Sequence, residues 1–314
     1  MTAPPARTAR GRYLAGVGGL LAVTAVWGTT FPLVKDMTTR LPVVDLLAVR
    51  YLMSGALLLA LRPRAVAAAA GRTWGTGAGL GAVYAGALVT QTYGLTLLPS
   101  PVSGFVTGSY VVMTPLLGLA WLRTRVTART WAATALAVAG LAAFTLMAGG
   151  DGGAISPAGL ALTVLSALLY AVHVVALSRW SRPEVAYVLA VAQIGTLALV
   201  FTAVAAPGGV ALPSTPGDWA GLVYLATVAG ALSFVTQTWA QAHIPAAPAA
   251  VVMSVEPLWA TAFAVLLYHE PAGWSLLVGG ACVLAATLLV SSPPEPGDAP
   301  PARPLVPARA AEDP

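Results

Sequence analysis

Glu256 is the acidic residue whose position could support chemistry. Among the eleven Asp and Glu residues, it alone lies near the middle of a long apolar run. Removal from water favours the neutral form of a carboxyl group, so Glu256 could bind and release a proton near neutral pH. The adjacent Pro257 removes one backbone donor and predicts a helix kink that frees nearby carbonyls. The alternative is a protonated Glu256 that makes an interhelical hydrogen bond.

Two cations accompany the first apolar runs. Arg50 stays ionised at any accessible pH and must find a carboxylate, carbonyl groups or water. Asp45, five residues earlier, does not share its helical face and is an imperfect partner. Lys35 is the one lysine among sixteen basic residues, which favours a site that needs a compact ammonium. The alternatives are a structural pair or snorkelling for Arg50, and an interfacial anchor paired with Asp36 for Lys35.

A cluster of polar and helix-breaking residues lies in the first apolar run. Trp27, Gly28, Thr29, Thr30 and Pro32 could break this helix and line a solute path. The indole of Trp27 would then offer a stacking or cation-π face. Equally, the threonines could bond the carbonyls four residues earlier while the tryptophan only packs.

Three glutamines and a histidine interrupt later runs. Gln91 and Gln237 occupy matching places in an internal repeat, Gln241 lies one turn beyond Gln237, and His173 stands alone in its run. Such residues could contact a ligand, although hydrogen bonding between helices is their commoner use in membranes. Paired with Glu256, His173 would also be the only constellation we can nominate for a membrane-embedded enzyme.

Several other chemistries are excluded. The single cysteine, Cys282, permits neither a disulfide framework nor a thiolate zinc site. His269 and Glu270 lack the second histidine of a metalloprotease motif, since position 273 is glycine. Glycines 75, 77, 79 and 81 enter an apolar run without a following Lys-Ser/Thr, so they predict close helix packing rather than a phosphate loop. We expect no catalytic residues, no metal and no cofactor.

The elements that must position these residues follow from composition. A chain with 58% hydrophobic residues, 9% charged residues and a mean hydropathy of +0.80 cannot cover a soluble surface, because soluble chains carry roughly 25% charged residues. Ten continuous apolar runs predict an all-α integral membrane protein, since barrel strands would alternate. The predicted helices span residues 14–34, 43–61, 76–97, 102–122, 129–147, 157–178, 184–205, 218–241, 247–267 and 273–291.

The basic residues predict the orientation. With the N-terminus inside, thirteen of the sixteen fall on the inner side, two on the outer side, and Arg50 within a span. The positive-inside rule therefore places both termini in the cytoplasm of a multi-pass protein of the cell membrane. The basic leader 1–13 is expected to be retained, and the Pro-rich tail 292–314 to be disordered. The positive charge reflects topology and not nucleic-acid binding; the expected partners are the lipid bilayer and a small molecule.

An internal repeat divides the chain into two halves. Gln91-Thr-Tyr recurs as Gln237-Thr-Trp at an offset of 146 residues. Val111-Val-Met followed by Pro115 recurs as Val251-Val-Met followed by Pro257, and the two prolines are offset by 142 residues. We predict five-helix repeats at residues 14–147 and 157–291, joined by a loop at 148–156. An odd number of spans inverts the second copy, and inverted repeats are typical of transporters. Pro32, Pro115 and Pro257 are the predicted helix kinks.

Several segments resemble one family. Trp27-Gly-Thr-Thr-Phe-Pro-Leu-Val-Lys35, Arg50-Tyr, Gly104-Phe-Val-Thr-Gly with Val-Val-Met-Thr-Pro115, and Ser254-Val-Glu-Pro257 running to His269-Glu270 are similar to the EamA family of the drug/metabolite transporter superfamily. The resemblance covers roughly residues 13 to 290. It implies ten helices in two inverted halves, a central cavity and transport of small metabolites, often outward. One departure is Arg123-Thr-Arg125, where the family often has an acidic residue.

These observations together predict a secondary transporter that exports a small metabolite or drug-like solute by alternating access. Protons would be the coupling ion, through Glu256. The alternative is a facilitated-diffusion permease without ion coupling; a membrane-embedded enzyme is the less favoured alternative.

Overall fold

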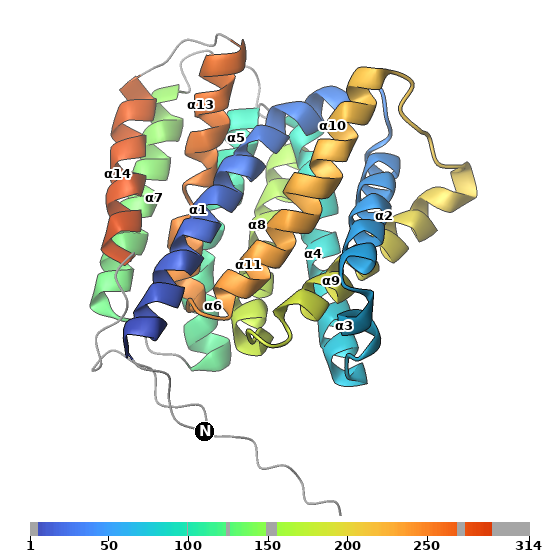
Figure 1. The fold of residues 1–314 in the computed structure, drawn as a ribbon. Helices are drawn as coiled ribbons and strands as arrows, with labels where there is room; N and C mark the ends of the chain where they lie inside the picture. The colour runs from blue at the N-terminus through green and yellow to red at the C-terminus, as the bar shows by residue number, and fades with distance from the viewer. Residues whose placement is uncertain (1–5, 99, 124–125, 149–155, 269–273, 291–314) are drawn as a thin grey trace, which may run out of the picture.

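The computed structural model of the protein describes residues 6–98, 100–123, 126–148, 156–268 and 274–290, and all regular elements in these ranges are helices (Figure 1). The all-α expectation is therefore confirmed for the described part of the chain. The expected tail 292–314, His269, Glu270 and most of the loop 148–156 lie outside it.

The described ranges fold into a series of helices. In chain order they are α1 (Ala6–Met37), α2 (Val43–Leu61), α3 (Pro63–Ala67), α4 (Gly71–Leu97), α5 (Ser100–Gly108), α6 (Tyr110–Leu122), α7 (Ala128–Ala148), α8 (Pro157–Trp180), α9 (Ala186–Ala205), the short η1 (Ala206–Gly208), α10 (Pro216–Ala226), the π-helix η2 (Thr227–Leu232), α11 (Ser233–Gln241), α12 (Ala246–Met253), α13 (Glu256–Tyr268) and α14 (Trp274–Val290).

Within the described ranges, six helical segments are long and apolar enough to cross a membrane. They are Ala9–Met37, Val43–Leu61, Val102–Leu122, Pro157–Trp180, Ala186–Gly208 and Pro216–Gln241. The shorter apolar helices Ala246–Ala260 and Val278–Val290 accompany them. A chain with this many apolar helices is a multi-pass membrane protein.

The helix interiors differ from the prediction in several places. The run 102–122 is divided into α5 and α6 at Ser109, and the run 247–267 is divided into α12 and α13 at Ser254 and Val255. The second break ends at Val255, two residues before Pro257, which cannot donate to the carbonyl of Met253. Of the two alternatives for the first run, the structure does not show the break, because α1 is continuous through Pro32. Helix α6 is likewise continuous through Pro115. Apolar composition locates a span, but it does not report a break within it.

Some observed helix ends also differ from the predicted ones. The first helix begins at Ala6 rather than at residue 14, and α4 begins at Gly71 rather than at residue 76. Hydropathy detects only the part of a helix that matches hydrocarbon, whereas the helix itself continues into the polar interface.

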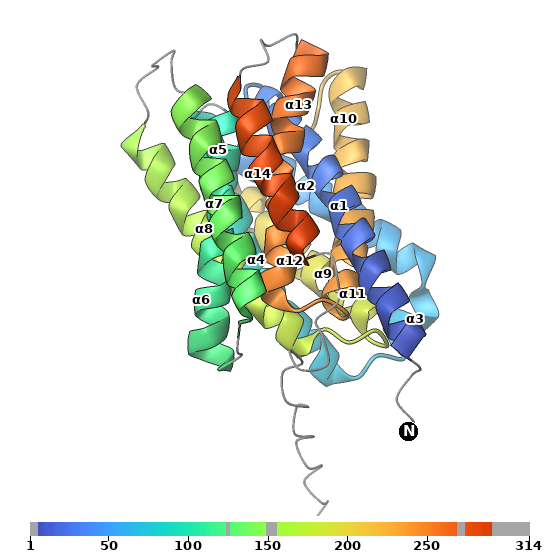
Figure 2. The same cartoon turned by 90° about the vertical axis from the view of Figure 1, so that its left-hand side faces the viewer.

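The first half of the chain packs mainly on the second. Helix α4 lies against α8 and α9, α2 lies against α9, and α1 lies against α11 and α13. Helices α7 and α14 lie side by side at one flank of the bundle, and α2 with α9 forms the opposite flank (Figures 1 and 2).

The contact between α4 and α9 depends on two glycines. A Cβ atom at Gly81 would lie 2.7 Å from the carbonyl oxygen of Gln193 and 2.8 Å from Cβ of Thr196, and a Cβ atom at Gly77 would collide with that of Ala192. The sequence-based expectation of close packing holds for these two residues. It was wrong for Gly75 and Gly79, whose positions have no neighbouring atom within 4 Å.

Candidate functional site

A cavity lies among helices from both halves of the chain. The space within it, including the part that is open to solvent, is about 710 Å³. Its lining is formed by Trp27, Thr30, Phe31, Val34, Arg50, Tyr84, Leu88, Gln91, Thr92, Leu95, Thr107, Tyr110, Tyr170, Val174, Gln237, Met253 and Glu256.

Most of the residues singled out in the sequence meet at this cavity. Those that line it are Trp27, Thr30, Arg50, Gln91, Gln237 and Glu256. Lys35, Gln241 and His173 do not contribute to the lining. The cavity thus combines one cation and one carboxyl group with amide, hydroxyl and aromatic side chains.

Glu256 is the first residue of α13, directly after the break from α12. Its side chain is half-buried and faces the cavity. Among the described residues, no hydrogen bond or ion pair satisfies its carboxyl group. The helix break therefore places a carboxyl group with free bonding capacity beside the solute space.

Arg50 lies on α2 and is only 5% exposed. Its Nε donates to the carbonyl oxygen of Leu225 at 3.2 Å, and its guanidinium carbon lies 5.2 Å from the ring centre of Tyr51. Asp45 is not its partner, because the Asp45 carboxylate accepts from the backbone nitrogen of Ala211 at 3.0 Å. Of the open alternatives for Arg50, the structure shows a carbonyl contact and not a carboxylate pair.

The two repeat-related glutamines differ in their contacts. The Oε1 of Gln91 accepts from the hydroxyl of Tyr170 at 2.8 Å, and its Nε2 donates to Thr107 Oγ1 at 3.3 Å. The Nε2 of Gln237 lies 3.7 Å from the sulfur of Met253, while its buried Oε1 has no partner among the described residues. Gln237 therefore retains an acceptor beside the cavity.

The tryptophan and threonines of α1 are hydrogen-bonded. Trp27 Nε1 donates to the carbonyl oxygen of Ala229 at 3.0 Å. Thr29 and Thr30 donate to carbonyls three residues earlier, at 2.6 and 2.8 Å. The structure thus places the threonine bonds at i−3 rather than i−4, and Trp27 both lines the cavity and ties α1 to η2.

Three tyrosines of the lining were missed in the sequence. Tyr84, Tyr110 and Tyr170 come from α4, α6 and α8, and the rings of Tyr84 and Tyr170 lie 5.2 Å apart in an edge-on arrangement. A tyrosine within a span carries a polar tip that needs a partner, which is the signal that could have found them. The sequence does not show which face of a helix meets a cavity.

His173 and Gln241 lie outside the lining. His173 Nε2 is 2.7 Å from the Oε1 of Gln193, and the imidazole packs edge-on against Tyr84 at 4.9 Å. Gln241 Nε2 donates to the carbonyl of Val174 at 3.1 Å and to Ser178 Oγ at 3.0 Å. Both residues join helices, and His173, which was nominated with Glu256 for the less favoured enzyme alternative, does not line the cavity with it.

Lys35 and its neighbours form polar links at the end of α1. Lys35 Nζ donates to the carbonyl oxygen of Leu98, the residue after α4, at 2.6 Å. The suggested pair of Lys35 with Asp36 was wrong, because Asp36 binds Arg40 at 2.6 Å. The preference of Asp36 for Arg40 follows from their i, i+4 spacing, which brings the side chains together.

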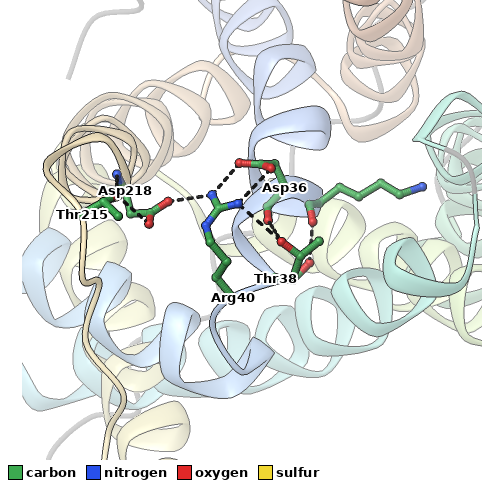
Figure 3. A network of polar contacts seen from close by, with 7 residues as sticks. Asp36, Thr38, Arg40, Thr215 and Asp218 are labelled. Carbon is green, nitrogen blue, oxygen red and sulfur yellow. Dashed lines mark hydrogen bonds and ion pairs between the residues drawn. The ribbon is translucent and has the colours of Figure 1, made fainter.

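Arg40 also joins the two halves of the chain. Its guanidinium contacts Asp218 of α10 at 2.7 Å, and Asp218 in turn accepts from the Thr215 hydroxyl at 2.8 Å (Figure 3). The hydrogen bonds to Asp36 and Asp218 raise the pKa of Arg40 above its ordinary value. This network therefore ties the end of α1 to the start of α10.

A bundle of apolar helices that encloses a polar cavity is typical of solute transporters. The chain belongs to the EamA-like transporter family, which matches residues 14–146 and again residues 157–292. The family resemblance identified in the sequence is thereby confirmed. Membership supports a membrane transporter of small solutes rather than an enzyme.

Solved structures share the fold. One of them, described as a crystal structure of a protein, is 19% identical, superposes with a TM-score of 0.70, and covers 87% of this chain and 95% of its own. At this identity the likeness concerns the fold alone. No curated protein sequence matches the chain.

Proposed function

We propose that the protein is a secondary transporter that exports a small polar or amphipathic solute across the cell membrane in exchange for protons. The observation that carries this proposal is the cavity between the two halves, with the unpaired Glu256 in its lining. A transporter needs a solute site that both halves share, so that their relative movement exposes it to either side in turn.

Two inverted five-helix repeats are part of this proposal. The packing supports them, because it keeps its pattern when the halves are exchanged. The second helices of the two halves, α2 and α9, pack on each other, and so do the fifth helices, α7 and α14. The pair α4 and α8 has its counterpart in α11 and α1. Ten spans follow when the broken helices α5–α6, α10–α11 and α12–α13 each count as one.

Alternating access requires contacts that one conformation has and the other lacks. The ion pair between Arg40 and Asp218 is such a contact, because it joins α1 of the first half to α10 of the second. We propose that it holds this end of the transporter together and separates when the cavity opens there.

The orientation is tested by labelling. With both termini in the cytoplasm, a cysteine introduced at Asp218 should react with an impermeant reagent in intact cells. A cysteine at Arg72 should react only after permeabilisation. Labelling of Arg72→Cys from outside would reverse the orientation.

Proton coupling is tested with Glu256→Gln in liposomes. The variant keeps the shape of the neutral acid but cannot release a proton, so it should lose uphill transport driven by a pH gradient. It should retain exchange of labelled solute between equal pools, because the solute space is unchanged. The matched control is Glu184→Gln, which removes an exposed carboxylate before α9.

Two results would contradict this coupling. If Glu256→Gln still concentrates solute against its gradient, Glu256 is not the coupling group. If the wild type shows no pH dependence, the protein is a facilitated-diffusion permease, and Glu256 serves as a hydrogen-bonding group of the solute site.

A further inference from the structure

We propose that the cavity is an anion site built around Arg50, and that its solute carries a carboxylate next to an apolar or aromatic body. This inference rests on the proposed function only in taking the occupant of the cavity to be the transported solute. It names the chemical class of that solute and the residue that selects it.

The guanidinium of Arg50 has unused donors. Of its five N–H groups, the Nε group is bonded to Leu225, and the terminal nitrogens have no hydrogen-bond partner among the described residues. Neither Asp45 nor Glu256 lies within ion-pair distance of it. Arg50 is at the same time 5% exposed and part of the cavity lining.

A buried cation without a counter-ion is costly at membrane depth. Water in the cavity can solvate the terminal nitrogens, but a carboxylate from the solute can accept from both in a bidentate fork. The solute would therefore supply the anion that this part of the chain lacks, and binding would be strongest for solutes with that group.

The carbonyl of Leu225, near the end of α10 and directly before the π-helix η2, holds Arg50 in this position. Carbonyls of this segment and of the residues directly before it accept from side chains of other helices: Leu225 from Arg50, Ala226 from Ser54 and Ala229 from Trp27. A π-helix shifts hydrogen bonds from i−4 to i−5, so the return to α geometry leaves a carbonyl without a helical donor. The register change accounts for the Ala229 carbonyl that Trp27 of α1 uses, whereas the two carbonyls that α2 uses belong to the last residues of α10.

The approach of η2 to α2 is close. A Cβ atom at Gly230 would lie 2.5 Å from Ser54 Oγ and 3.0 Å from the carbonyl oxygen of Leu225. Gly230 therefore permits η2 to approach α2 at Ser54, one turn from Arg50, while the Nε of Arg50 is bonded to Leu225 of α10 and its terminal nitrogens remain for the cavity. The fixed guanidinium is a positioned donor rather than a mobile surface charge.

The other lining residues indicate which kind of group the rest of the solute carries. Tyr84, Tyr110, Tyr170 and Trp27 present aromatic surface, and Leu88, Val174 and Met253 add apolar surface. Aromatic and apolar bodies gain from burial against such rings. A carboxylate attached to an aromatic ring combines both features.

The test compares carboxylates with their amides, which differ mainly in charge. The probes are 3-phenylpropionate with 3-phenylpropanamide, and phenylalanine with phenylalaninamide, titrated calorimetrically into the purified protein. We expect each carboxylate to bind at least about tenfold more tightly than its amide, since hydrogen bonds to charged groups contribute roughly 1.5–3 kcal/mol. The second pair shows whether an added ammonium group is accepted, and preference for the carboxylate in either pair supports the proposal.

Variants connect this preference to Arg50. Arg50→Gln should reduce the ratio of carboxylate affinity to amide affinity to about one. Arg50→Lys should keep part of the preference, because the positive charge remains but the planar guanidinium does not. Arg72→Gln, a surface change on α4, should leave it intact. Where Arg50→Gln does not fold, phenylglyoxal modification of wild-type Arg50 replaces it, read by mass spectrometry. The carboxylates and not the amides should protect Arg50 from modification.

The outcomes separate this inference from the transport function. Equal binding of carboxylates and amides, binding of none of the four probes, or a carboxylate preference that persists in Arg50→Gln would overturn the anion site. Arg50-dependent binding without solute movement in liposomes would overturn the transport function and leave the anion site standing. Counterflow of a neutral solute at the wild-type rate in Arg50→Gln would overturn the anion site and leave the transport function standing.

Discussion

The close contact between α4 and α9 predicts that Gly81→Ala lowers the stability of the protein, and Gly79→Ala on the same helix is the control. In Gly81→Ala the new methyl group would lie 2.7 Å from the carbonyl oxygen of Gln193 and 2.8 Å from Cβ of Thr196, whereas ordinary contacts are 3.4–4 Å. Both neighbours belong to α9 and cannot rotate away, so the helices must separate. In Gly79→Ala the methyl group meets no atom within 4 Å.

The magnitude follows from overpacking. Extra methyl groups in a packed interior cost about 1–3 kcal/mol, and close glycine contacts are a main source of helix association in membranes. Alanine favours the helix by up to about 1 kcal/mol over glycine, which offsets part of the loss at Gly81. We expect Gly81→Ala to be less stable than the wild type by about 1–2 kcal/mol, and Gly79→Ala to be unchanged or slightly more stable.

The assay is thermal unfolding of the three purified proteins in one detergent at one heating rate, since unfolding of such proteins is often irreversible. Gly81→Ala should melt roughly 2–6 °C lower. A pair of compensating changes extends the test. Gly77→Ala should be destabilised because its methyl group collides with that of Ala192. Adding Ala192→Gly removes this collision, so the double variant should be more stable than the sum of the two single changes predicts. Equal melting of Gly81→Ala and Gly79→Ala would refute the close packing of these helices.

Three further predictions concern polar links. Lys35→Met should cost about 0.5–1 kcal/mol in unfolding free energy, because a cation at the C-terminal end of α4 is lost, and Lys35→Arg should restore it; impaired transport by a stable Lys35→Arg protein would instead place Lys35 on the solute path. Asp218→Asn removes the pair with Arg40, so a cysteine at Thr30 should react faster from that side, by a margin that narrows at high salt; identical labelling rates would exclude the proposed latch. Gln241→Ala should lower stability by roughly 0.6–2 kcal/mol with no change in solute affinity, and an affinity loss would show that Gln241 contacts the solute.

Part of the candidate site could be predicted from the sequence. Arg50, Gln91 and Glu256 were identified because a polar group in hydrocarbon is costly wherever it lies. That cost depends only on residue type and on the surrounding run, so it is visible without a fold. The same reasoning found His173, which the structure places against Gln193 outside the lining. The cost of placing a polar residue in hydrocarbon indicates that the residue has a role, but it does not identify the groups that the residue contacts.

The sequence by itself determined the helical class, the apolar runs and the family. These depend on local quantities: hydrophobicity over about 20 residues, and the need of each segment to satisfy its own backbone hydrogen bonds in lipid. Basic residues at the ends of the runs, and the matching of Gln91 with Gln237, added the predicted orientation and repeat.

Tertiary structure alone decided which helical faces meet. Tyr84, Tyr110 and Tyr170 come from three helices and converge only because those helices pack around one cavity. The π-helix η2 and the break at Ser109 have the same apolar composition as the α-helices around them. A change of hydrogen-bond register leaves hydropathy unaltered. Side chains of other helices bind carbonyls in this segment and directly before it, as Trp27 and Arg50 do. Those contacts lie far apart in the chain, and only the folded bundle brings them together.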